Sequence, residues 1–80
     1  MSARNFYLLR AKSLVKEARE EKGVPYLELA KRLKSHGVMI DEQVLINRIN
    51  RGTYSFAFAL QVLAALGVDS IKVPKLPSSK

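Results

Sequence analysis

The sequence contains no cysteine and no tryptophan, and its single histidine is His36. Without cysteine the chain has neither a disulfide framework nor a thiolate metal site, which agrees with a reducing cytoplasm. His36 also lacks a second histidine with which to share a metal ion, so we expect it in a loop or at a helix C-terminus. No Ser/His/Asp order, glycine-rich phosphate loop or inward carboxylate pair is recognisable. We therefore expect no enzyme activity and no cofactor.

Long hydrophobic runs are also missing. The most apolar stretch, residues 56–66, is far shorter than the roughly 20 residues that a membrane-spanning helix requires. The first residues lack the long apolar core of a signal peptide. From these features we expect a soluble cytoplasmic domain with no membrane partner and no evident small-molecule ligand.

Acidic residues are scarce. The 80-residue chain has 14 lysines and arginines against 7 acidic residues, a net charge of +7, and no acidic residue lies between Glu42 and Asp69. Such a balance favours binding to a polyanion without specifying a fold. An apolar content of 48% suits one small domain with one core.

Apolar residues recur at helical spacing along most of the chain, which predicts an all-α fold of four to five short helices. We expect a first helix over residues 4–22 that ends at Gly23, and a second from Pro25 to about residue 35. Asp41 is the expected N-cap of a third helix that Gly52 ends. The fourth helix is expected over residues 56–66.

The C-terminal residues give weaker signals. Residues 68–73 alternate in a way that is compatible with a short strand. Residues 74–80 are basic and proline-containing, so we expect a flexible tail after a domain that spans residues 1–73.

The fourth predicted helix is apolar on nearly every side, with Gln61 its only polar side chain. Such a helix is expected to be buried on several sides, partly by a second subunit. Residues 6–9 widen the apolar face of the first helix, which suggests a contact with the C-terminal tail or another subunit. The candidate dimer surfaces are residues 56–66, residues 71–73 and residues 6–9, with the first two preferred.

The third predicted helix has two contrasting sides. Leu45, Ile46 and Ile49 fall on one side and can anchor it in a core. The other side carries Gln43, Asn47, Asn50 and Arg51, with Arg48 on the flank. Amide and guanidinium groups form bidentate hydrogen bonds with the edges of adenine and guanine. The helix is therefore a candidate for DNA recognition.

Three segments in order resemble the Cro/repressor-type (lambda-repressor-like) helix-turn-helix domains: residues 26–33 (YLELAKRL), residues 46–52 (INRINRG) and residues 63–68 (LAALGV). Residues 47–52 with the following SFAF and LQ also resemble a small bacterial family of uncharacterised helix-turn-helix domains. The chain departs from the larger family in a longer turn, residues 35–40, and in Pro25, where a Ser or Thr cap is common. The resemblance implies a helix-turn-helix at the centre of the fold.

The resemblance further implies that the helix around residues 41–51 enters the major groove. Gln43 and Asn47 are then expected to contact bases, and Val44 a thymine methyl group. Arg48 is expected to contact guanine or phosphate, and Arg51, at the helix end, phosphate.

The resemblance also implies a phosphate contact from Tyr26, which occupies the position where the family often contacts phosphate, near the positive end of the second helix. Thr53, Tyr54 and Ser55 offer further contacts with the DNA backbone. Alternatives remain at this point. Tyr26 can pack in the core with its hydroxyl at the surface, and Asn47 can bond locally.

The sequence thus predicts sequence-specific binding of double-stranded DNA by a transcriptional repressor or regulator. One such module covers about half of a typical operator, so we expect a homodimer on a pseudo-palindromic site. The alternative is a regulator that uses the same fold to bind a protein, in the manner of an antiactivator or antitoxin. RNA binding ranks third, because the aromatic ladder that stacks on single strands is missing.

Overall fold

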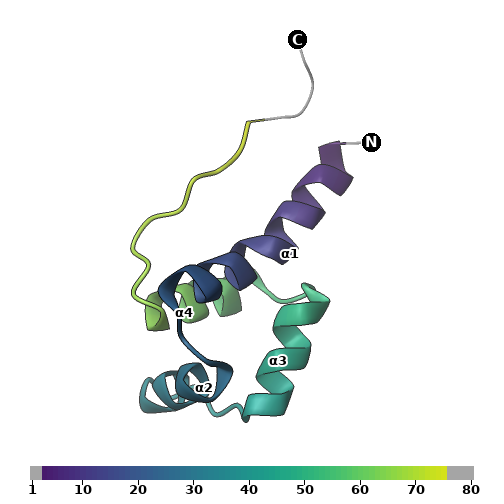
Figure 1. The fold of residues 1–80 in the computed structure, drawn as a ribbon. Coiled ribbons are helices and arrows are strands. Elements are labelled where there is room, and N and C mark those ends of the chain that lie inside the picture. The colour runs from purple at the N-terminus through teal and green to yellow at the C-terminus, as the bar shows by residue number, and fades with distance from the viewer. Residues whose placement is uncertain (1–2, 76–80) are drawn as a thin grey trace.

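A computed structural model describes residues 3–75 of the chain, with side chains from residue 5 onward, and it is all α-helical as expected (Figure 1). The four helices are α1 (Ala3–Lys22), α2 (Tyr26–Ser35), α3 (Glu42–Arg51) and α4 (Phe56–Ala65). Both α1 and α2 pack against α3 and against α4. None of the helices described is long and apolar enough to cross a membrane.

The core lies where the four helices meet. Leu29 and Leu33 of α2 and Leu45 and Ile49 of α3 are fully buried. The remaining core side chains are Val15, Ala18, Val24, Ala30, Phe58, Val62, Leu63, Ala65 and Leu66. The apolar periodicity of α2 and α3 therefore marks their buried sides correctly.

Three of the helices end in the same way, on a Gly-Val pair. The glycine has a positive φ, and the valine N–H donates to a carbonyl five residues back, which satisfies groups that the helix end would otherwise leave unbonded. These bonds are Val24 N to Arg19 O at 3.2 Å, Val38 N to Leu33 O at 2.9 Å and Val68 N to Leu63 O at 2.9 Å. Each valine also packs in or against the core, so each pair turns the chain back toward the interior.

The start of α2 differs by one residue from the expectation. Pro25 has an extended conformation (φ −63°, ψ 155°) and occupies the N-cap, so that the first helical residue is Tyr26. The Pro25 carbonyl accepts a hydrogen bond from Leu29 N at 2.9 Å, but no side chain caps the helix. At the other end of α2, His36 is the C-cap, as expected.

The segment after α4 turns back along α1 without forming a strand anywhere in the described part of the chain, so the expected strand over residues 68–73 is absent (Figure 1). Tyr7 of α1 donates its hydroxyl to the carbonyl oxygen of Pro74 at 2.7 Å. The apolar start of α1 therefore contacts the C-terminal segment, one of the two expected partners. Pro74 is held rather than free, and the rest of the predicted tail after residue 75 lies outside the described residues.

The fourth helix is buried on one side only, so the expectation of burial on several sides is wrong for a single chain. Its inner side packs Phe58, Val62 and Leu63 between α1 and α2. Its outer side leaves Phe56 72% and Leu60 48% exposed. Two helices cover only one side of a third, which leaves an apolar surface on the outside of α4.

Candidate nucleic-acid interface

The third helix is defined at both ends by the two residues expected from the sequence. The Asp41 side chain caps the start, accepting a hydrogen bond from Val44 N at 2.9 Å. Gly52 ends the helix in the left-handed conformation (φ 74°), and its N–H donates to Arg48 O at 3.1 Å. Both ends of α3 are therefore capped within the chain, and the helix is a well-defined support for its exposed side chains.

The two sides of α3 lie as the sequence indicates. Leu45 and Ile49 are fully buried and Ile46 is half-buried. The exposed side chains are Gln43, Val44, Asn47, Arg48, Asn50 and Arg51. All the α3 residues that we expected to contact DNA are thus accessible on one surface.

The two residues expected to contact bases are bonded to each other. Gln43 donates from Nε2 to Oδ1 of Asn47 at 3.1 Å, across one helical turn. The Gln43 carbonyl oxygen and the Asn47 amide nitrogen remain as an acceptor and a donor on the exposed surface. The local bond considered for Asn47 is present, and it orients the pair instead of removing it from the surface.

Arg48 lies on the flank that faces α4. Its guanidinium carbon is 4.9 Å from the centre of the Phe58 ring, which is buried at the start of α4. A cation over an aromatic face is attracted by the ring quadrupole, so this contact holds Arg48 in place. Arg51, one turn later, is exposed at the C-terminal end of α3.

The middle of α1 comes very close to the end of α3. A Cβ added at Gly52 would lie 2.5 Å from Cγ and 3.1 Å from Cα of Lys12. Only a glycine fits this approach, which brings the exposed Lys12 beside the chain segment that carries Arg51. We did not anticipate a contribution from Lys12, because the two residues are far apart in the sequence and no local pattern links them.

Lys12, Lys16 and Arg19 occur at spacings of four and three residues and therefore share one side of α1. One end of this basic stripe lies at Gly52. At the other end, the guanidinium of Arg19 lies 4.0 Å from the centre of the Tyr26 ring. The stripe therefore connects the end of α3 with the start of α2.

Tyr26 is half-buried and packs against the core, with Arg19 on its ring. Arg19 also donates from Nη1 to the carbonyl oxygen of Val24 at 2.9 Å. The first N–H groups of α2 have no side-chain cap, so the positive end of the helix is open beside a tyrosine and an arginine.

The three hydroxyl residues between α3 and α4 differ in role. Tyr54 donates its hydroxyl to the carbonyl oxygen of Ala11 at 2.8 Å, and burial raises the pKa of its phenol. The Ser55 hydroxyl is the N-cap of α4 and accepts from Phe58 N at 3.0 Å. Thr53 is exposed. Two of the three hydroxyls that we assigned to DNA contacts thus have bonds inside the protein.

The carboxylate of Glu17 is held away from the α3 surface. Glu17 pairs with Arg10 at 2.8 Å, and this bond lowers the pKa of the Glu17 carboxyl. Both residues border the C-terminal segment, on the side of α1 opposite the basic stripe. Within α3 the only carboxylate is that of Glu42, in the first turn. Among residues 3–75, no group of His, Cys, Asp and Glu side chains is suited to hold a metal ion.

The sequence profile of one protein family matches residues 7–71, which include nearly all of α1 and the whole of the other helices. The chain belongs to this family. It is described as a domain of unknown function, DUF6471. No curated protein and no solved structure matches the chain. The matched residues of this DUF6471 domain include the whole exposed surface of α3, the basic stripe and Tyr26.

Proposed function

We propose that this DUF6471 domain binds double-stranded DNA sequence-specifically, as a cytoplasmic transcriptional repressor or regulator with α3 in the major groove. The observation that carries the proposal is the outer surface of α3. It combines the bonded Gln43–Asn47 amide pair with Arg51 on a helix that is anchored by buried leucine and isoleucine. Amide and guanidinium groups on a rigid, exposed helix suit hydrogen bonding to base edges.

Base contacts are assigned to Gln43 and Asn47, whose remaining acceptor and donor match the edge of an adenine. Val44 is 43% exposed and is assigned to a thymine methyl group. Arg48 has a fixed position over the Phe58 ring and is assigned to the flank of the groove.

Phosphate contacts are assigned to the C-terminal end of α3 and the start of α2. Arg51 and Lys12 place two cations at the C-terminal end of α3. At the start of α2, Tyr26 lies beside the positive helix end, which has no side-chain cap. A helix-turn-helix is typically held on the duplex by backbone contacts on either side of the recognition helix. The two assigned phosphate contacts match this arrangement, in agreement with the family resemblance.

Selection of bound sequences from a random duplex pool tests the proposal. We expect enrichment of one motif, after which two substitutions are compared on that motif and on random DNA. Asn47→Ala should weaken binding to the motif by about 1–3 kcal/mol and leave random DNA nearly unchanged, whereas Arg51→Ala should weaken both. Gln61→Ala removes an exposed amide from α4 and serves as the matched control, with no expected effect.

A second function, binding of a regulatory protein partner by the same fold, is favoured by one observation. Met39 in the turn before α3 is 74% exposed, beside a hollow of about 240 Å³ that it lines with Lys34, Ile40 and Asp41. Methionine adapts to varied protein surfaces. Absence of enrichment, together with no DNA binding at low salt, would favour this alternative.

A further inference from the structure

The outer surface of α4 is apolar and uncovered. Phe56, Leu60 and Ala64 follow one another at intervals of four residues and are all exposed. Residues four apart lie above one another on a helix, so the three form one stripe along α4. We call these residues the outer stripe.

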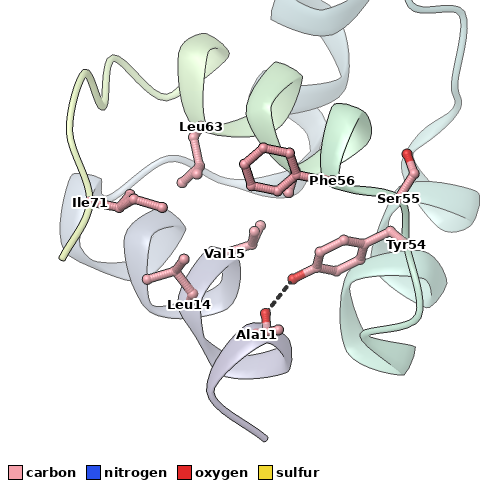
Figure 2. A pocket seen from close by; sticks show the side chains of 9 residues that line it. Ala11, Leu14, Val15, Tyr54, Ser55, Phe56, Leu63 and Ile71 are labelled. Atoms are coloured by element: carbon pink, nitrogen blue, oxygen red, sulfur yellow. Dashed lines mark hydrogen bonds between the residues drawn. The ribbon is translucent and has the colours of Figure 1, made fainter. Parts of the chain in front are cut away.

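Two apolar hollows adjoin the outer stripe. One, of about 260 Å³, lies between α1 and α4 and has Phe56 at its rim, facing Leu63 and Ile71 (Figure 2). The other, of about 250 Å³, lies at the opposite end of the stripe and is lined by Leu60, Leu63, Ala64, Val68, Asp69, Ser70 and Ile71. The stripe thus has a protruding aromatic ring at one end and a cavity beside its small residue at the other.

Charge narrows the choice of what covers this surface. The chain has a net charge of +7, so two copies repel each other over most of their surface. Residues 52–68 contain no charged side chain, and they include the whole of α4. A second copy can therefore approach along α4 without placing cation against cation, whereas a polyanion finds no cation there.

The spacing of the outer stripe is self-complementary. Leu60 lies midway between Phe56 and Ala64, which are about 12 Å apart along the helix axis. If a second copy packs its α4 antiparallel, with a two-fold axis at Leu60, the Phe56 ring of each copy meets Ala64 of the other. A cavity of about 150 Å³ accommodates benzene, so the hollow of about 250 Å³ at that end has room for the ring.

The antiparallel arrangement also satisfies the ends of the helices. The first turn of α4 contains no acidic residue, so its positive end, which the Ser55 hydroxyl caps, has no carboxylate beside it in that turn. Asp69 lies at the other end of the stripe, in the wall of the hollow that would take the ring. In an antiparallel pair this carboxylate faces the positive end of α4 in the second copy.

We propose that the outer stripe is a homodimer interface in which α4 packs antiparallel on α4 of a second copy, with the two-fold axis at Leu60. The expectation of a dimer rests in part on the proposed function, because a pseudo-palindromic DNA site requires two copies. Arg48 of α3 meets α4 at Phe58, which lies two residues from Leu60 and so on the opposite side of α4. The interface therefore leaves the α3 surface open. An isologous contact of this kind closes after two copies.

The test is the mass of the full chain in solution, measured without DNA by sedimentation equilibrium over a range of concentrations. Leu60→Glu brings two carboxylates together at the axis and should weaken dimerisation by about 100-fold or more. Leu27→Glu is the matched control, since Leu27 of α2 is 51% exposed against 48% for Leu60. It should leave dimerisation unchanged, and circular dichroism should show both variants folded.

A charge-pair variant tests the antiparallel direction. Phe56→Lys and Ala64→Glu should each weaken the dimer, and the double variant should recover at least about 10-fold in affinity, because the new lysine faces the new glutamate of the other copy. The two positions are too far apart to pair within one helix.

Three results would overturn the proposal. They are a wild-type chain that stays monomeric at every concentration, a dimer that Leu60→Glu does not affect, and a dimer that is lost instead on Leu9→Glu in α1. A monomeric Leu60→Glu chain that still binds random duplex DNA at low salt would separate this interface from the DNA surface. Failure of DNA binding with an intact dimer would refute the proposed function alone.

Discussion

Replacing Gly52 by alanine should cost far more stability than the same change at the other helix-ending glycines. All of them have a positive φ, and Gly23 (66°) and Gly67 (82°) bracket the 74° of Gly52. A left-handed conformation costs a residue with a Cβ about 1–2 kcal/mol. At Gly23 and Gly67 a Cβ meets nothing within 4 Å, so this strain is the whole expected effect in the folded state.

At Gly52 the added methyl group would also collide with Lys12. It would lie 2.7 Å from Cβ and 3.1 Å from Cα, and these atoms cannot swing away as the end of a side chain can. Overpacking of this kind costs about 1–3 kcal/mol, which gives about 2–5 kcal/mol in total for Gly52→Ala. To relieve the collision, α1 would have to move away from the end of α3.

Urea unfolding followed by circular dichroism measures the difference between the three variants. Gly23→Ala and Gly67→Ala should lower the free energy of unfolding by similar amounts, and Gly52→Ala by clearly more. Equal losses at all three positions would show that α1 does not approach Gly52 as described, and would remove Lys12 from the DNA surface.

Two further predictions concern the hydrogen bonds of Asp41, at the start of α3, and of Tyr54, in the loop after α3. Asp41→Ala removes the acceptor for Val44 N and should lower stability by about 1 kcal/mol in thermal unfolding, whereas Glu20→Ala, which removes an exposed carboxylate from α1, should have little effect. Burial raises the pKa of the Tyr54 phenol in the folded state, so the fold favours the protonated phenol. The contribution of this group to the free energy of unfolding is therefore complete at neutral pH and is lost as pH rises above about 10. Tyr54→Phe removes the bond to Ala11 and should therefore be about 1 kcal/mol less stable than the wild type at neutral pH. On going to alkaline pH, this variant should lose less stability than the wild type loses. An unchanged alkaline pH dependence in this variant would contradict the burial of Tyr54.

The helices and the inner side of α3 could be predicted from the sequence because they depend on local signals. The apolar spacing of Leu45 and Ile49, the cap at Asp41 and the stop at Gly52 all act within a few residues. The exposed surface of α3 follows directly, since it is the side opposite the buried one. The Gly-Val pairs are an equally local signal, whose repetition we did not recognise in the sequence.

The parts that the sequence did not reveal depend on contacts between distant segments. Nothing near Lys12 indicates that it lies against Gly52, and nothing near Tyr54 indicates that its hydroxyl turns inward to Ala11. Arg32 similarly donates to the carbonyl oxygen of Ala65 at 3.1 Å and so helps to end α4, although its position on α2 suggests a solvated side chain. The expected burial of α4 was too high because the composition of a helix does not say how many other helices pack against it.

The salt dependence of binding to random duplex DNA tests the central claim, that the α3 surface binds nucleic acid, most directly. The logarithm of the association constant should fall linearly with the logarithm of salt concentration, and Arg51→Ala should reduce the slope by about 1. Lys72→Ala, which removes an exposed cation from the C-terminal segment, should leave the slope unchanged. Absence of binding at low salt, or the same slope for Arg51→Ala as for the wild type, would contradict the assignment of α3 to DNA.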